Sequence, residues 1–254
     1  MAVLELGPEA LLIMLGAVAF GALVKAVTGL GVPPVAIPVF AAFVGIRDAV
    51  VAMAVPVLVT NLQLAWRYRA HRSEVPNLGR LVTSALVGSV VGAMVLDRIP
   101  ERILAAAIGI IVLGYLALMV RRPSAALRPM VARALAVPVA GTAGALQGAT
   151  GLSAQVIVTY LAALRMSRGG FVFAVAILLQ VSGLGQFLGV LGLGLLTPLV
   201  LQLGLATTIV VVTVLALVTP LAERLPQRVF ELGVRAVLFA SSLRLLYDAF
   251  LAGA

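Results

Sequence analysis

The chain has 254 residues, of which 63% are hydrophobic and only 11% are charged, and its mean hydropathy is +1.20. Soluble domains carry roughly 25% charged residues, so this composition excludes a soluble domain and indicates a polytopic membrane protein. A net charge of +9 would suggest a nucleic-acid partner in a soluble protein. Here the arginines lie in short loops between apolar runs, where they orient membrane helices. We therefore expect a lipid bilayer as the surroundings and no nucleic-acid partner.

Ten apolar segments follow one another along the chain, five in each half. A helix needs about 20 residues to cross the hydrocarbon core, and the second and seventh segments are too short for a comfortable crossing. Each short segment could form a helix hairpin with the segment before it, or continue a full helix as a tilted, partly unwound one. The predicted segments are 8–27, 32–46, 48–66, 78–96, 101–120, 131–149, 154–164, 169–192, 196–220 and 229–251.

The two halves of the chain repeat one another. Residues 25–31 (KAVTGLG) return as residues 147–153 (QGATGLS), and DRIPER at 97–102 returns as ERLPQR at 223–228. Two membrane halves that interrupt a hydrophobic segment at matching positions are typical of transporters with a site between the repeats. We predict an all-α polytopic membrane protein with two inverted repeats, 1–125 and 126–254, in one integrated transmembrane domain.

The arginines predict the orientation of the segments. Loop 67–80 and linker 121–133 are rich in arginine and should be cytoplasmic, whereas loop 97–102 has no net charge and can lie outside. If the short segments return the chain to its starting side, both termini lie outside and the halves have opposite orientations. A rival topology treats each interrupted pair as one crossing. It places Arg224 and Arg228 outside and the uncharged turn at 192–197 inside, which fits the arginines less well.

The interruption TGLGVPP at 28–34 cannot continue as a regular helix, because glycines permit other dihedrals and residues before prolines avoid the helical region. We expect a new helix from Val35, and Pro38 could prolong the irregularity. A helix start carries partial positive charge and backbone N–H groups without partners, which an anion would satisfy. The two breaks are therefore predicted to bind a small anion.

Polar side chains gather around both breaks. Lys25, the only lysine, lies one turn before the first break, and Gln147 holds the equivalent place in the second copy. Ionisable residues inside membrane segments are rare and usually functional, although Lys25 could instead reach the cytoplasmic interface. The predicted substrate-binding residues are Lys25, Thr28, Gly29, Gly31, Asn61, Gln63, Gln147, Thr150, Gly151, Ser153 and Gln155.

Other polar and small residues allow a structural interpretation. Asn61 and Gln63, and their counterparts Gln180, Ser182 and Gln186, either line the path or form hydrogen bonds between helices. The stripe at 88–92 (GSVVG) predicts close packing of two helices.

Patterns for catalysis and metal binding are not found in the sequence. It has no cysteine, one histidine (His71, in a basic loop), no HExxH motif and no recognisable phosphate loop. A Ser–Lys dyad would need Lys25 beside a serine such as Ser153, which nothing in the sequence requires. We expect no enzyme activity, no cofactor and no metal.

The breaks and the runs after them resemble the TauE/SafE-type sulfite exporter family of bacterial membrane proteins. In that family each half opens with a glycine-rich stretch, broadly G-x-G-G-G, then a proline and an alanine-rich run. Residues 29–31 and Pro38 fit the first stretch, and 48–52 (DAVVA) fit the run. A basic loop with a tyrosine follows at 68–72, and the second half has 151–153 (GLS) and 173–176 (FAVA). The glycine run is shortened in both halves, to GVP at 31–33 and SAQ at 153–155.

The resemblance implies a bacterial inner-membrane transporter that exports sulfite, an organosulfonate or a related small oxyanion. Two alternatives stay open: an uptake transporter for sulfate or a small carboxylate, and a membrane-embedded enzyme or accessory subunit. The expected partners are a small anionic substrate and the bilayer, with a homodimer left open.

Overall fold

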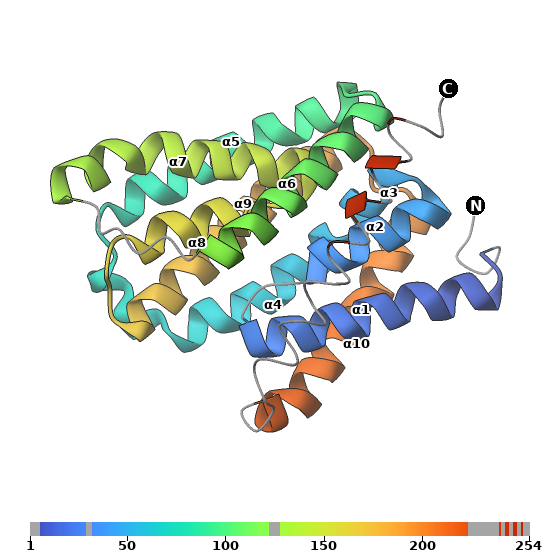
Figure 1. The fold of residues 1–254 in the computed structure, drawn as a ribbon, viewed down its shortest axis with the longest axis horizontal. Helices are drawn as coiled ribbons and strands as arrows, with labels where there is room; N and C mark the ends of the chain where they lie inside the picture. Colours follow the sequence, from blue (N-terminus) through green and yellow to red (C-terminus); the bar gives the residue numbers. More distant parts are fainter. Residues whose placement is uncertain are drawn as a thin grey trace. The chain divides into compact units, whose positions relative to one another are not determined.

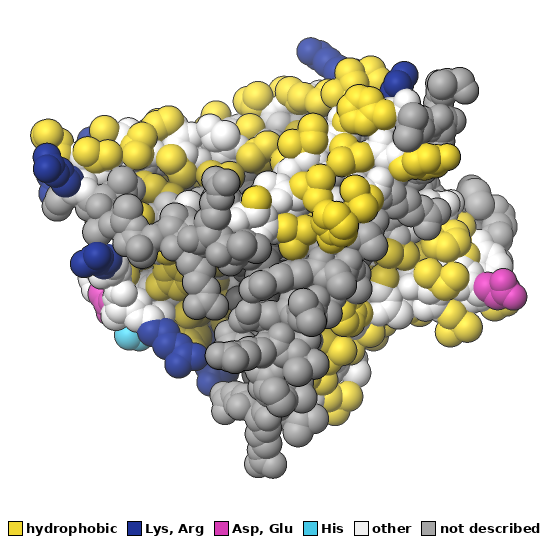
Figure 2. Space-filling model, viewed as in Figure 1, with side chains coloured by type: hydrophobic (Ala, Val, Ile, Leu, Met, Phe, Trp, Pro, Cys, Tyr) yellow, Lys and Arg dark blue, Asp and Glu magenta, His cyan; other side chains and the backbone are white. Residues whose placement is uncertain are grey.

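The computed structural model describes residues 6–28, 32–121 and 128–222, together with 239, 242, 243, 246, 247 and 250. All regular elements in these residues are helices (Figure 1). Hydrophobic side chains cover much of the described surface, and charged side chains lie near its margins (Figure 2). Within the described residues, six helical stretches are long and apolar enough to cross a bilayer: Pro8–Ala26, Ile46–Arg67, Leu78–Arg98, Met130–Thr150, Arg168–Gly192 and Pro198–Val218. The chain is therefore an all-α, multi-pass membrane protein.

Nine of the ten predicted segments coincide with helices, and the ends agree to within two residues. The tenth, 229–251, lies outside the described residues except for a few single positions. Loop 223–228, with the second copy of DRIPER, also lies outside them. The helices are α1 (Pro8–Thr28), α2 (Val32–Val44), α3 (Ile46–Ala52), α4 (Ala54–Arg67), the 3-10 helix η2 (Arg69–Glu74), α5 (Leu78–Arg98), α6 (Glu101–Arg121), α7 (Pro129–Thr150), α8 (Ala154–Ala162), α9 (Arg168–Gly192) and α10 (Pro198–Ala222).

The third predicted segment is two helices, α3 and α4, rather than one. Pro56 has no N–H to donate to the carbonyl of Ala52, and its ring crowds that carbonyl, so α3 ends at Ala52. Before α3, Gly45 has a φ of 84°, a conformation that glycine adopts without strain. This glycine lets the chain turn sharply between α2 and α3.

Helix α2 starts earlier than expected. It is continuous from Val32 to Val44 and includes Pro38, so the expected start at Val35 and the expected irregularity at Pro38 are both wrong. The first turn holds Pro33 and Pro34, where a missing N–H removes no intrahelical hydrogen bond. Pro38 removes only the bond to Pro34, and the buried surroundings of α2 hold the helix together.

Contacts divide the chain into two compact units, and each unit draws on both halves of the sequence. One unit contains the described parts of 1–56, 99–120 and 196–254, with α1, α2, α3, α6 and α10. The other contains the described parts of 57–98 and 121–195, with most of α4, then η2, α5, α7, α8 and α9.

The helix pairs inside the two units are reciprocal. In one unit α5, the fourth segment of the first half, packs against α7 and α9, the first and third segments of the second half. In the other unit α10, the fourth segment of the second half, packs against α1 and α3, from the first and third segments of the first half. Two copies of one fold that exchange their fourth helices would produce this pattern. The opposite orientation of the copies stays a prediction.

Helices α5 and α7 approach so closely that their main chains touch. A Cβ atom on any of four glycines would overlap a main-chain carbonyl of the facing helix, as the small-xxx-small packing of membrane helices requires. The stripe predicted at 88–92 is therefore confirmed, and its partner on α7 is 141–148. A step of four residues along α5, from Gly88 to Gly92, moves the contact four residues along α7 in the same direction, from Gly141 to Ala145. Helices α5 and α7 therefore run parallel. The overlapping pairs are Gly88 with Gly141, Gly92 with Ala145, Gly144 with Ala85, and Gly148 with Ser89.

Candidate functional site

The chain reverses direction after α7. Helix α7 ends at Thr150, and Gly151 adopts the left-handed conformation (φ 73°, ψ 7°), with its N–H donating to the carbonyl of Gln147. Helix α8 begins at Ala154 and has only 9 residues. It runs back beside α7, because the Tyr160 hydroxyl donates to the carbonyl of Ala132, near the beginning of α7, at 2.8 Å. The second short segment is therefore the returning arm of a hairpin.

Three buried side chains join this hairpin to α9. The Ser153 hydroxyl donates to Oε1 of Gln147 at 2.7 Å, and Nε2 of Gln147 donates to Oε1 of Gln186 at 2.9 Å. Each of the three is at most 2% exposed. Gly185 of α9 faces Ser89 of α5 and Gly189 faces Ala93, so α9 runs parallel to α5 and therefore to α7. Gln147 and Gln186 meet level with the reversal.

Some buried polar atoms near this junction have no hydrogen-bond partner. They include the amide donor Nε2 of Gln186 and the amide oxygen Oε1 of Gln155, in the first turn of α8. The oxygens Oε1 of Gln180 and Oγ of Ser182, further back along α9, are in the same condition. An unsatisfied buried polar group costs about 1–3 kcal/mol, and a bound ligand is one explanation for such a group. The first N–H groups of a helix also lack intrahelical acceptors. Near the start of α8 one buried amide donor, Nε2 of Gln186, and one amide acceptor, Oε1 of Gln155, are thus without partners.

The other predicted residues of the second copy have defined places. The Thr150 hydroxyl donates to the carbonyl of Leu146 at 2.7 Å and accepts from the N–H of Leu152 at 3.3 Å. Thr150 thus holds the end of α7, and its proton is already engaged. Gln155 is 6% exposed, and Gly151 supplies the turn itself.

The first copy is described only in part. Gly29, Gly31 and the side chain of Thr28 lie outside the described residues. Lys25 is half-buried in the last turn of α1 and has an interaction partner. On α4, Asn61 is 2% exposed whereas Gln63 is exposed, so the two predicted residues face in different directions.

Gln186 is not among the residues predicted to bind the substrate. Its sequence position is compatible with lining the path or with a bond between helices, and the structure gives it a bond between helices and an unpartnered amide donor. Its spacing of four residues from Ser182 puts both side chains on one face of α9. The Ser89 hydroxyl on α5 donates to the carbonyl of Ser182, which ties that face to α5.

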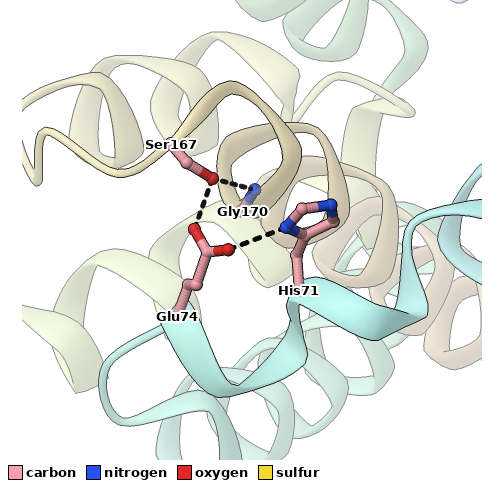
Figure 3. Close-up of polar contacts among 4 residues, drawn as sticks. All are labelled: His71, Glu74, Ser167 and Gly170. Carbon is pink, nitrogen blue, oxygen red and sulfur yellow. Dashed lines mark hydrogen bonds and ion pairs between the residues drawn. The ribbon is translucent and has the colours of Figure 1, made fainter.

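A second polar cluster fixes the beginning of α9 (Figure 3). Ser167 caps the helix by accepting from the N–H of Gly170 at 3.0 Å, and its hydroxyl donates to a carboxylate oxygen of Glu74 on η2. The other oxygen of Glu74 lies 2.7 Å from Nδ1 of His71. The hydrogen bond from Ser167, followed by that from His71, lowers the pKa of the Glu74 carboxyl. The cluster is exposed, and its hydrogen bonds hold the beginning of α9 against η2, in the arginine-rich loop.

Comparison with protein-family models matches residues 13–245 to the family described as sulfite exporter TauE/SafE. The chain belongs to this family. A search of curated proteins and a search of solved structures found no match. The matched range includes both glycine-rich breaks and all the predicted site residues, so the resemblance suggested by those breaks is confirmed. TauE/SafE proteins are membrane transporters, in agreement with the multi-pass helical fold.

Proposed function

We propose that this TauE/SafE protein exports a small sulfur oxyanion, sulfite or an organosulfonate, and that the anion binds where α8 begins. The observation that carries the proposal is the buried amide donor of Gln186, which has no partner and lies in the hydrogen-bonded chain Ser153–Gln147–Gln186. An oxyanion has the acceptor oxygens that this donor and the first N–H groups of α8 lack.

The donors proposed at the start of α8 are neutral. A helix start supplies partial positive charge, and the unpartnered amide donor of Gln186 adds a hydrogen bond that replaces water of the anion. We assign the corresponding role in the first copy to Lys25, Thr28, Gly29 and Gly31, where the ammonium of Lys25 adds a full positive charge.

The proposed direction follows from the membrane potential. In a bacterial inner membrane with a negative interior, moving one negative charge outward gains about 2.3 kcal/mol per 100 mV. Export can therefore proceed without a coupling ion. The proposed topology places both termini outside, with the arginine-rich loops inside.

Flux of labelled sulfite and of a sulfonate from vesicles that contain the purified protein tests the proposal. The variant Gln186→Glu keeps the oxygen that accepts from Gln147 and replaces the unpartnered N–H donor by a carboxylate oxygen. A hydrogen bond to a charged group contributes about 1.5–3 kcal/mol, so we expect the KM for the anion to rise at least about 10-fold. The matched control is Gln202→Leu, at an exposed glutamine of α10, which should transport normally.

Normal KM in Gln186→Glu, with an unchanged unfolding temperature, would show that the anion binds elsewhere. The same vesicles separate the alternative functions. Flux of sulfate or a carboxylate but not of sulfite would favour the uptake transporter. No flux of any oxyanion by folded protein would favour the enzyme or accessory subunit.

A further inference from the structure

We propose that the groove between α5 and α7 binds one acyl chain of an anionic phospholipid, whose phosphate is held by Arg80 and Arg133. The groove has a volume of about 590 Å³, within the range of small-molecule sites. This site is separate from the start of α8 and does not depend on the proposed export activity.

The lining of the groove suits an acyl chain. Val87, Val91 and Val137 are 63%, 49% and 49% exposed and flank the groove. The half-buried Gly88 and Gly141, whose main chains are in contact, add no side chains between these valines. The Thr83 hydroxyl at one end already donates to the carbonyl of Gly79 at 2.9 Å, so it does not need a polar ligand. The lining is thus mostly valine, glycine and alanine, with the hydroxyls of Thr83, Ser84 and Thr142 as its polar groups, which suits an apolar chain over most of the groove.

The charges lie at one end of the groove. Arg80 is four residues before the lining residue Ser84, and Arg133 is four residues before the lining residue Val137, so each arginine is on the groove side of its helix. Because α5 and α7 run parallel, both arginines and both helix N-termini are at the same end. In Figure 2, Lys and Arg side chains gather at the left margin, where α5 and α7 begin in Figure 1.

This combination fits an anionic lipid of the cytoplasmic leaflet. Helix N-termini and arginines attract phosphate, and basic pockets between membrane helices on the cytoplasmic side bind anionic headgroups. A second copy of the chain fits less well. In a membrane a symmetric partner would have the same orientation, so its own Arg80 and Arg133 would meet these two and repel them.

Native mass spectrometry of the purified protein tests the proposal by measuring the binding of a synthetic phosphatidylglycerol. Phosphatidylcholine is the neutral comparison. We expect tighter binding of phosphatidylglycerol. Each neutralised arginine should weaken that binding about fivefold, so the double variant Arg80→Gln/Arg133→Gln should lose most of it. The matched double variant Arg72→Gln/Arg165→Gln removes two exposed arginines from η2 and the α8–α9 loop and should bind normally.

A third variant tests the groove itself. Gly141→Leu adds a side chain in the groove, and its Cβ would lie 3.9 Å from the nearest atom of α5, an ordinary contact. It should weaken the binding of both lipids while the protein unfolds at its usual temperature. Equal affinity for the two lipids, or loss of binding in the two double variants alike, would overturn the proposal. A dimer that Gly141→Leu dissociates would show that a second copy occupies the groove instead.

Discussion

At the scale of single residues, the amide of Gln147 joins the two sides of the candidate site. It accepts from Ser153 and donates to Gln186, so its orientation is defined from both ends. In the first copy the same place is held by Lys25, which carries a charge and cannot accept a hydrogen bond. The two copies therefore offer different chemistry at equivalent positions, one cationic and one neutral.

Removal of the Ser153 hydroxyl should destabilise the hairpin. In Ser153→Ala the buried oxygen Oε1 of Gln147 loses its donor, which should lower the free energy of unfolding by about 1–3 kcal/mol. Thermal unfolding in detergent measures the change. Ser73→Ala, at an exposed serine of η2, should change stability by less than about 0.5 kcal/mol. Equal effects of the two substitutions would contradict the role given to Ser153.

Glu74 should make stability depend on acid pH. Its pKa is lower in the folded protein because Ser167 and His71 donate to its carboxylate. The folded state therefore gains stability above the unfolded pKa, about 4.3, and loses it as the pH falls through the lowered folded value. Glu74→Gln should unfold at a lower temperature than the natural chain at neutral pH, and the difference should shrink toward acid pH.

The control for that series is Asp97→Asn, an exposed carboxylate at the end of α5. A difference between Glu74→Gln and the natural chain that stays constant between neutral and acid pH would show that the Glu74 charge does not hold η2 to α9.

At the scale of helices, the seam between α5 and α7 depends on glycines. Gly144→Ala places a methyl group against the carbonyl of Ala85, and overpacking of this kind costs about 1–3 kcal/mol. Gly16→Ala on α1 is the control, because a Cβ atom there meets no atom within 4 Å. Unfolding temperatures should separate the two variants, and a Gly144→Ala protein as stable as Gly16→Ala would show that the helices do not pack this closely.

Helix positions could be predicted from the sequence because apolar runs end at glycines, prolines or arginines. The break at Met53 was missed, because Pro56 acts on a carbonyl four residues earlier, inside an unbroken apolar run. Which helices pack together could not be predicted, since that depends on residues far apart in the chain. The role of Gln186 could not be predicted either, because its partner Gln147 lies 39 residues away in the chain.

At the scale of the whole molecule, α5 pairs with α7 and α9, and α10 pairs with α1 and α3. The inverted repeat itself stays a prediction. The repeated sequence predicted the duplication, and the arginines predicted opposite orientations of the copies. The orientation is a separate matter, because helix pairing inside each unit does not say which side of the membrane a loop occupies.

Single cysteines can establish the orientation, since the natural chain has no cysteine. A membrane-impermeant thiol reagent applied to intact cells should label Glu9→Cys and Thr197→Cys, which are predicted outside. It should label Ser73→Cys only after the cells are opened. Protection of Glu9→Cys and Thr197→Cys in intact cells would favour the rival topology, which also keeps loop 67–80 inside. Labelling of Ser73→Cys in intact cells would contradict both topologies.

We propose that a small oxyanion binds to the donors at the start of α8. Selenite has the shape and charge of sulfite, and its selenium atom can be located by anomalous diffraction from crystals grown with it. We predict a selenium peak whose oxygens lie within hydrogen-bond reach of Nε2 of Gln186 and the first N–H groups of α8. At the same subsaturating selenite concentration, the peak should be weaker in Gln186→Glu. A selenium site elsewhere, with nothing at the start of α8 at saturating selenite, would contradict the account.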